Sequence, residues 1–250
     1  MTLTIIIPAH NEEKTIAEVL RRVLKVDLGE WQKEIIVVND GSTDKTGKII
    51  NKIFGIRPVH HKINLGKGSA IQTGLKTAKG DYVLIQDADL EYFPEDIPKL
   101  LLVLSNPFPF DYRSGQALNP SPQQGREIVE VAVFGKRGFK AYPERGFHYV
   151  VGAWMLTTCY NLLYGQKLTD LYTGYKLIPS HIFKTLNIQS KGFEFEAEVS
   201  CKLAKRGVII KEVPINYQPR NKDQGKHIRF VDAIKGFWKI IKLRFKLFEQ

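Results

Sequence analysis

The sequence predicts an α/β fold in which a mostly parallel sheet carries helices on both faces. Short apolar runs rich in isoleucine and valine alternate with longer stretches of helical spacing, which is typical of βαβ units. The composition is that of a globular chain, with 43% hydrophobic, 11% aromatic and 25% charged residues among 250. This supply of apolar side chains is enough for one sizeable core and excludes a disordered chain.

The first half is expected to hold four strands, with a helix after each of the first three. The strands are expected at residues 3–7, 34–38, 56–60 and 82–86, and the helices at 13–24, 43–54 and 68–78. Parallel sheets bind ligands beyond the carboxyl ends of their strands. Polar clusters follow three of these ends, at residues 8–12, 39–42 and 87–89. We therefore expect the three clusters to meet at one edge of the sheet.

The second half is less regular. Residues 106–125 hold four of the twelve prolines without periodicity, which predicts a long surface loop, a lid, or an insertion without function. An edge strand is expected at 130–134 and a last strand at 208–214, with helices at 150–163 and 195–205. We expect one catalytic domain over residues 1–228 and a basic helix over 229–250.

The carboxyl-terminal helix concentrates the positive charge of the chain. Of the net +11, residues 202–250 contribute 13 basic against 4 acidic side chains. On a 3.6-residue period its apolar side chains form one stripe with a lysine face opposite. The stripe is Phe230, Ile234, Phe237, Trp238, Ile241, Phe245 and Phe248, and the lysines are Lys235, Lys239, Lys242 and Lys246. Such a helix is too polar to span a bilayer. It could dock its stripe on the protein's own core, lie on an anionic membrane, or bind nucleic acid.

Other features of the chain indicate a cytoplasmic location. The amino terminus has no basic segment followed by a long apolar run, so no secretory signal is expected. Cys159 and Cys201 lie far apart and outside any metal-binding spacing, which fits buried thiols in a reducing compartment.

Asp87-Ala88-Asp89 is the segment most suggestive of catalysis. In extended backbone both carboxylates point the same way, and the small Ala88 lets a ligand approach. Two neighbouring carboxylates repel unless a cation compensates them, and Mg²⁺ or Mn²⁺ is the usual cation with phosphate substrates. Glu91 could add a third oxygen ligand. A solvated acidic turn is the alternative.

Two further segments favour an anionic, nucleotide-like ligand. Asp40 follows the second strand and could accept hydrogen bonds from a base or ribose, as could Glu12 after the first, while Ser42 or Thr43 is expected to cap the next helix. Lys67 lies between two glycines at the start of a helix, which suits phosphate. The segment is not a P-loop, however, and no GxGxxG is present.

The chain resembles glycosyltransferase family 2, and within it the polyprenyl-phosphate, dolichol-phosphate mannose synthase-like sugar transferases. The similar segments cover residues 2 to about 226. In order they are TIIIPAHNEEKTI, VVNDGSTDKT, NLGKGSAIQTGL, GDYVLIQDADLEYFPEDI, VFGKR, LTDLYTGYK and GFEFEAEV. The resemblance implies a GT-A (Rossmann-like) fold and a nucleotide-sugar donor of the GDP-mannose or UDP-glucose type.

The resemblance also implies roles for individual residues. The donor would be held by Pro8, His10, Glu12, Asp40, Lys67, Asp87, Ala88 and Asp89, and the metal by Asp87, Asp89 and Glu91. Arg137, Arg220 and Lys226 would bind the donor or acceptor phosphates, and Asp170 would lie near the acceptor. The chain departs from the family pattern at His10, Glu91 and Gly225, where tyrosine, glutamine and serine are frequent, and in the 106–125 segment.

The resulting hypothesis is an inverting, metal-dependent transferase that loads a sugar onto a polyprenyl phosphate at the cytoplasmic membrane face. A lipid phosphate is already anionic, so Arg137, Arg220 and Lys226 would position it, with Asp89 at the metal. A hydroxyl acceptor, as in cell-envelope polysaccharide synthesis, would need a base, and Asp170 is the candidate. The alternatives are a sugar nucleotidyltransferase and a non-catalytic basic adaptor. No nucleic-acid partner is expected, and a membrane-protein partner is possible.

Overall fold

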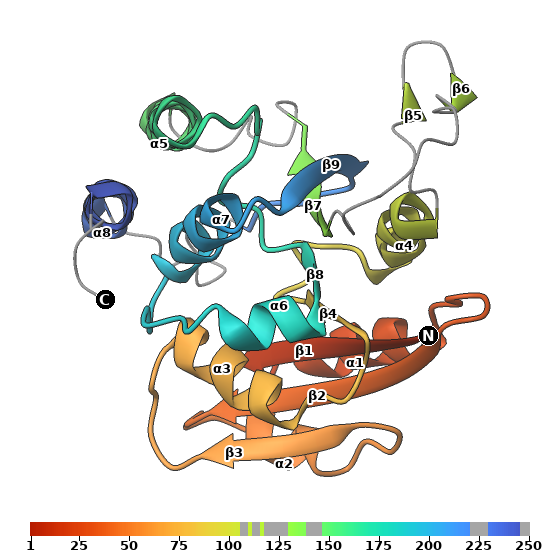
Figure 1. The fold of residues 1–250 in the computed structure, drawn as a ribbon. Coiled ribbons are helices and arrows are strands. Elements are labelled where there is room, and N and C mark those ends of the chain that lie inside the picture. The colour runs from red at the N-terminus through yellow and green to blue at the C-terminus, as the bar shows by residue number, and fades with distance from the viewer. Residues whose placement is uncertain (106–109, 112–115, 118–129, 139–146, 221–229, 246–250) are drawn as a thin grey trace.

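The computed structural model describes residues 1–105, 110–111, 116–117, 130–138, 147–220 and 230–245. They form a seven-stranded sheet in the order β3-β2-β1-β4-β8-β7-β9 with helices packed against it (Figure 1). The strands are β1 (Thr2–Ala9), β2 (Gln32–Asp40), β3 (Arg57–His61), β4 (Tyr82–Ile85), β7 (Val131–Arg137), β8 (Lys176–Pro179) and β9 (Ile209–Ile215). This architecture confirms the predicted fold class.

The sheet is parallel throughout except at β8. Strands β1, β2, β3 and β4 pair in parallel, as do β7 and β9, whereas β8 runs antiparallel to both of its neighbours. The carboxyl ends of the six parallel strands therefore lie at one edge, together with the amino end of β8. Every predicted site segment that the structure describes follows one of these strands or precedes β8.

Helices cover both faces of the sheet. One face carries α3 (Lys67–Thr77), α5 (Phe147–Tyr164), α6 (Ser180–Thr185), α7 (Phe195–Lys205) and α8 (Phe230–Phe245), and the other carries α1 (Ile16–Lys25), α2 (Thr46–Ile50) and α4 (Ile97–Ser105) after a short 3₁₀ turn at Pro94–Asp96. Consecutive strand residues alternate between the two cores. Ile6 belongs to the first and Ile5 and Ile7 to the second, and all three are fully buried. This explains why the strands read as continuous apolar runs.

Several expectations need correction. The strand expected at an edge, β7, lies between β8 and β9, so β9 is the edge strand. Strand β8 and helices α4 and α6 were not expected at all. Helix α2 begins only at Thr46 and has no side-chain cap. Ser42 instead accepts a hydrogen bond from the Asn11 amide at 3.0 Å, and the Thr46 amide donates to Asp44 at 2.9 Å.

The proline-rich segment 106–125 is described only in part. Within it, β5 (Phe110–Asp111) pairs antiparallel with β6 (Gln116–Ala117). Its other residues lie outside the described part of the chain, so its role as loop, lid or insertion stays a prediction.

Helix α8 packs on the core through a different face from the predicted stripe. Ile240 is fully buried, and Ala233 and Leu243 pack against the same core. The Tyr164 hydroxyl of α5 donates to the Ile240 carbonyl at 3.0 Å. Four members of the stripe are exposed, namely Ile234, Phe237, Trp238 and Phe245. The interpretation that the stripe docks on the core is therefore wrong.

Lys239 leaves the lysine face to approach Glu198 of α7 at 3.5 Å, whereas Lys235 and Lys242 are exposed. Phe248 and Lys246 lie outside the described residues. Among the helices that the structure describes, none has the length and apolar run that crossing a membrane requires.

Gly41 is required by a close approach at the end of β2. Its φ is +64°, and a Cβ there would lie 2.2 Å from the backbone carbon of Ile63. Gly29 has a similar φ of +62° but nothing within 4 Å of a Cβ. The left-handed conformation alone costs a residue with a side chain about 1–2 kcal/mol.

We expect Gly41→Ala to lower the free energy of unfolding clearly more than Gly29→Ala, since it must also displace the 63–66 segment. Urea unfolding of the two variants measures the difference. Equal losses would show that the segment moves aside without cost.

Candidate active site

The loops after β1 and β2 are tied together at the ligand edge. The Glu12 amide donates to Thr46 Oγ1 at 2.8 Å, and the Thr43 amide donates to the Asn11 side chain at 2.8 Å. His10 Nδ1 lies 2.8 Å from the Asp40 carbonyl. The predicted nucleotide residues His10, Glu12 and Asp40 are thus held on one cross-linked platform, and Pro8 lies in the last part of β1 beside β2.

The carboxylate of Asp40 is occupied by the protein itself. It is 3% exposed and accepts hydrogen bonds from the amides of Leu65 and Gly66 at 2.9 and 2.8 Å, while His61 Nδ1 lies at 2.7 Å. Its clearest role in the structure is to fix the segment that leads into Lys67. Direct contact between Asp40 and a nucleotide stays a prediction.

Lys67 joins the donor-side cluster. Its ammonium lies 2.7 Å from Asp87 Oδ1 and 3.1 Å from Glu196 Oε1 of α7. Burial alone would lower the pKa of Lys67, but the two carboxylates raise it above its ordinary value. Lys67 therefore stays charged, as binding an anionic ligand requires.

A guanidinium group lies between Glu12 and the Asp89 segment. Arg220 Nη2 is 2.8 Å from both oxygens of Glu12 and 3.7 Å from Asp89 Oδ2, and Nε donates to the Asp89 carbonyl at 2.9 Å. The Arg220 amide donates to Glu91 Oε1 at 2.8 Å, and the Tyr217 hydroxyl donates to Glu91 Oε2 at 2.6 Å. The structure thus brings Arg220 to the donor side of the site.

The three carboxylates predicted to hold a metal have different partners. Asp87 pairs with Lys67, Asp89 faces Arg220, and Glu91 is buried against Tyr217 and the Arg220 amide. In the described part of the chain, no three His, Cys, Asp or Glu side chains gather closely enough to hold a metal ion by themselves. Ala88, between the two aspartates, is buried.

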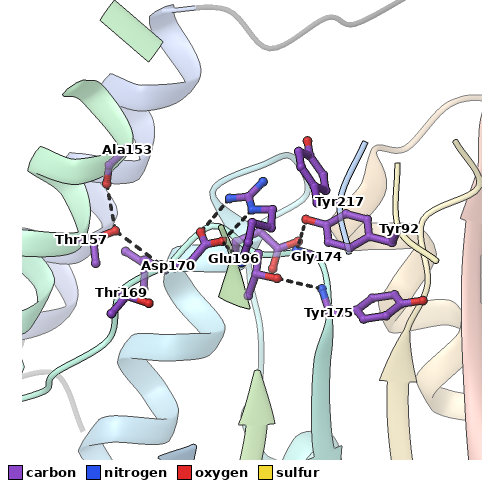
Figure 2. A network of polar contacts seen from close by, with 12 residues as sticks. Tyr92, Ala153, Thr157, Thr169, Asp170, Gly174, Tyr175, Glu196 and Tyr217 are labelled. Atoms are coloured by element: carbon purple, nitrogen blue, oxygen red, sulfur yellow. Dashed lines mark hydrogen bonds and ion pairs between the residues drawn. The ribbon is translucent and has the colours of Figure 1, made fainter. Parts of the chain in front are cut away.

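A second charged cluster lies at the ends of β7 and β9. Arg137, the last residue of β7, makes a bidentate pair with Asp170, with Nε–Oδ2 at 2.6 Å and Nη2–Oδ1 at 2.7 Å. Both side chains are more than nine-tenths buried. The Asp170 turn is held by Glu212, which accepts from the Thr169 and Asp170 amides at 2.9 and 3.0 Å. Figure 2 shows Asp170 together with Gly174, Tyr217 and Tyr92.

Tyr217 connects the two clusters. Its hydroxyl donates to Glu91, and the Arg137 guanidinium lies 5.0 Å from the centre of its ring. Tyr92 packs edge-on against Tyr217 and accepts a hydrogen bond from the Gly174 amide at 2.7 Å. The donor side and the Arg137–Asp170 pair therefore belong to one contiguous site.

Sequence reasoning missed several residues of this site, namely Tyr92, Lys176, Glu196, Glu212 and Tyr217. Lys176 and Glu196 lie in or beside segments that carry the resemblance, where a charged residue in an apolar setting was an available signal. Nothing in the sequence singles out Glu212. Lys226, a predicted phosphate ligand, lies outside the described residues.

Comparison with known proteins identifies the chain's relatives. The family described as Glycosyl transferase family 2 matches residues 4–157. The low-salt glycan biosynthesis hexosyltransferase Agl6 of Haloferax volcanii is 30% identical over 92% of this chain. The undecaprenyl-phosphate 4-deoxy-4-formamido-L-arabinose transferase of Edwardsiella ictaluri is 37% identical over 98% of it. The chain spans 53% of the first protein's length and 66% of the second's.

A solved structure supports the fold. The glucosyl-3-phosphoglycerate synthase of Mycobacterium tuberculosis, in complex with Mn²⁺, UDP and phosphoglyceric acid, superposes with a TM-score of 0.67. It is 19% identical, and the match covers 98% of this chain and 78% of that one. The GT-A architecture expected from the sequence is confirmed.

Proposed function

We propose that this chain, which belongs to glycosyl transferase family 2, moves a sugar from a nucleotide-sugar donor to a polyprenyl phosphate. One observation carries the proposal: acidic residues Glu12, Asp87 and Asp89 and the cations Lys67, Arg137 and Arg220 meet at one sheet edge. Such an edge suits a donor diphosphate with its metal ion, and an acceptor that is itself an anion. The polyprenyl-phosphate transferase from Edwardsiella supports this acceptor class.

The residues on the donor side fit a hard divalent cation. A positively charged group already lies among the oxygens of Glu12 and Asp89, which shows that this position favours a cation. Oxygen ligands from one or two carboxylates plus substrate phosphates are what Mg²⁺ and Mn²⁺ prefer. We assign Asp89 as the main protein ligand, with Asp87 and Glu91 beside it. When bound, the metal would neutralise charge that develops on the leaving diphosphate.

In the proposed reaction, the bond between the anomeric carbon and the diphosphate oxygen breaks, and its electron pair leaves with the nucleoside diphosphate. An acceptor phosphate oxygen forms the new bond from the opposite face, which inverts the anomeric centre. Lys67 and Arg220 would bind the donor, and Arg137 would orient the acceptor phosphate. Holding the two reactants in line is the main contribution that an already anionic acceptor needs.

The pairing of Asp170 favours a phosphate acceptor over a hydroxyl. Both oxygens of Asp170 receive short hydrogen bonds from Arg137, which lowers the tendency of the carboxylate to take a proton. A hydroxyl acceptor needs such a base, whereas a phosphate oxygen does not. Asp170 therefore acts by orienting Arg137.

A product assay tests the proposal. The protein is incubated with Mn²⁺ or Mg²⁺, a panel of UDP- and GDP-sugars, and either a short polyprenyl phosphate or the corresponding polyprenol. We expect a nucleoside diphosphate and a glycosylated lipid phosphate with the first acceptor and none with the second. Sugar transfer to the alcohol would favour a hydroxyl-acceptor transferase, and release of pyrophosphate from a nucleoside triphosphate would indicate a nucleotidyltransferase.

We also propose that α8 holds the enzyme against the cytoplasmic face of an anionic membrane. Its exposed stripe includes Trp238, 64% exposed, and the adjacent helix α5 exposes Trp154 and Met155 to about the same degree. Figure 1 shows the two helices side by side. Aromatic side chains flanked by lysines are typical of helices that lie in the headgroup region.

Flotation with liposomes tests the membrane face. Phe237→Ser combined with Trp238→Ser should reduce binding to anionic vesicles at least tenfold, since each buried apolar side chain contributes about 1.5–3 kcal/mol. Lys235→Glu with Lys242→Glu should weaken binding to anionic but not to neutral vesicles. Phe54→Ser is the control, because Phe54 is 94% exposed but follows α2 on the other face of the sheet. Unchanged flotation of both double variants would contradict the proposal.

A further inference from the structure

A chain of four alternating charges runs from the site into the interior. Asp87 pairs with Lys67, Lys67 with Glu196, and Glu196 with Lys176, at 2.7, 3.1 and 2.7 Å. With every group ionised the chain is electrically neutral. Lys67 and Asp87 are at the rim, whereas Glu196 is 3% exposed and Lys176 fully buried.

Glu196 is compensated by the two lysines. Among the described residues neither of its buried oxygens has a hydrogen bond of regular geometry, so the facing ammonium groups balance its charge. It lies in the first turn of α7, where the helix dipole also favours a carboxylate. Removing its charge would leave two ammonium groups against Asp87 alone.

Lys176 extends the network to the acceptor side. Its ammonium donates to the carbonyl of Leu171 at 3.1 Å and to that of Thr173, and lies 4.7 Å from the Phe134 ring. These carbonyls belong to the turn between Asp170 and Gly174 (Figure 2). Burial lowers the pKa of Lys176, and Glu196 opposes that effect.

The turn in its place confines Asp87 from the other side. A Cβ on Gly174 would lie 2.6 Å from Asp87 Oδ2. Asp87 is therefore held between Gly174, fixed through Lys176, and Lys67, fixed through Glu196.

A buried ion pair is seldom the most stable way to fill a core, since apolar residues of similar volume often do as well or better. Its presence behind the rim pair therefore calls for another role. We propose that Glu196 and Lys176 are positioning residues, which hold Lys67 and Asp87 in the arrangement that binds the nucleotide part of the donor. This inference rests on the proposed function and assigns a role to two residues that touch neither substrate.

The test separates positioning from stability. Glu196→Gln should lower the affinity for UDP or GDP in the presence of Mn²⁺, measured by calorimetry, about tenfold or more, as loss of a supporting partner typically does. It should also lower the unfolding midpoint. Glu196→Gln with Lys176→Met removes both charges, so the midpoint should recover while the affinity stays low. In kinetics, the KM for the donor should rise more than kcat falls.

Glu198→Gln is the matched control. Glu198 is a carboxylate on the same helix, 1% exposed, and pairs with Lys202 at 2.6 Å. It should lower the unfolding midpoint and leave nucleotide affinity unchanged.

Three outcomes would overturn the inference. The double variant could bind nucleotide as tightly as the unchanged protein, which would show a role in stability alone. Glu198→Gln could weaken binding equally, which would show a general effect of lost stability. If Glu196→Gln does not fold, the double variant decides between these readings. Failure of the unchanged protein to bind either nucleotide would instead refute the proposed function, and this inference with it.

Discussion

Replacing Asp89 by asparagine will lower the rate of sugar transfer by about 10²–10³-fold, the loss typical when a group that stabilises developing charge is removed. Asp89 follows β4, and its carboxylate faces the cation position beside Glu12. Asparagine keeps the size of the side chain but removes the negative charge that a divalent ion requires. The measurement is the rate of nucleoside diphosphate release at saturating donor, over a range of Mn²⁺ concentrations.

Asp81→Asn is the control for this result. Asp81 immediately precedes β4 at its opposite end, and its carboxylate accepts a hydrogen bond from the Thr2 amide at 2.7 Å. That change should leave transfer nearly unaltered. If Asp89→Asn retains more than a tenth of the activity, the metal assignment is wrong.

Asp170→Asn will produce the largest loss of stability among the single substitutions considered. The change leaves the buried Arg137 guanidinium without its bidentate carboxylate, and breaking a buried pair from one side typically costs 3–5 kcal/mol. Urea unfolding measures the loss. Because the variant also frees Arg137 from its orientation, the KM for a polyprenyl phosphate should rise.

The matched control is Glu18→Gln on α1. Glu18 also forms short ion pairs, with Arg21 at 2.7 Å and Arg22 at 2.9 Å, but on the surface. Pairs in solvent contribute little, so this loss should be far smaller. If Asp170→Asn abolishes transfer to a hydroxyl acceptor while sparing transfer to a phosphate, Asp170 is a base and the positioning role is refuted.

Local pattern predicted the first half of the fold because each element there has its own period. Strands β1, β2, β3 and β4 and helices α1 and α3 were expected within a few residues of their observed bounds. Helix α4 was missed because IPKLLLVLS is apolar almost throughout and shows no helical period. Strand β8 has only four residues, KLIP, and is buried at every position. A short buried run carries no alternation that would mark it as a strand.

Site segments could be predicted, but their partners could not. In a parallel sheet the carboxyl ends of the strands must share an edge, so the meeting of the 8–12, 39–42 and 87–89 segments followed from topology. The contact between Arg220 and Glu12 spans 208 positions in the chain and depends on where β9 lies in the sheet. The sequence placed β7 at an edge and did not order the strands. Arg220 was therefore assigned to the phosphates and not to the acidic residues that it contacts.

Helix α8 shows the same limit on a smaller scale. Its apolar stripe is real as a pattern, but Ala233, Ile240 and Leu243 on another side provide the packing. Small and aliphatic residues fit against α7 and α5 more closely than aromatic ones. Periodicity identifies an apolar face, whereas complementarity of shape decides which face is buried.

The reversal of a single strand, β8, determines where this protein can tolerate added sequence. Its first residue, Lys176, lies at the reactive edge, and its last, Pro179, leads into α6 at the opposite edge. Peptide tags or reporter loops placed in the turn that follows Thr185 would therefore stand away from the chemistry, while any lengthening just ahead of Lys176 would intrude on it. An engineer who assumed that all seven strands run the same way would choose the wrong end.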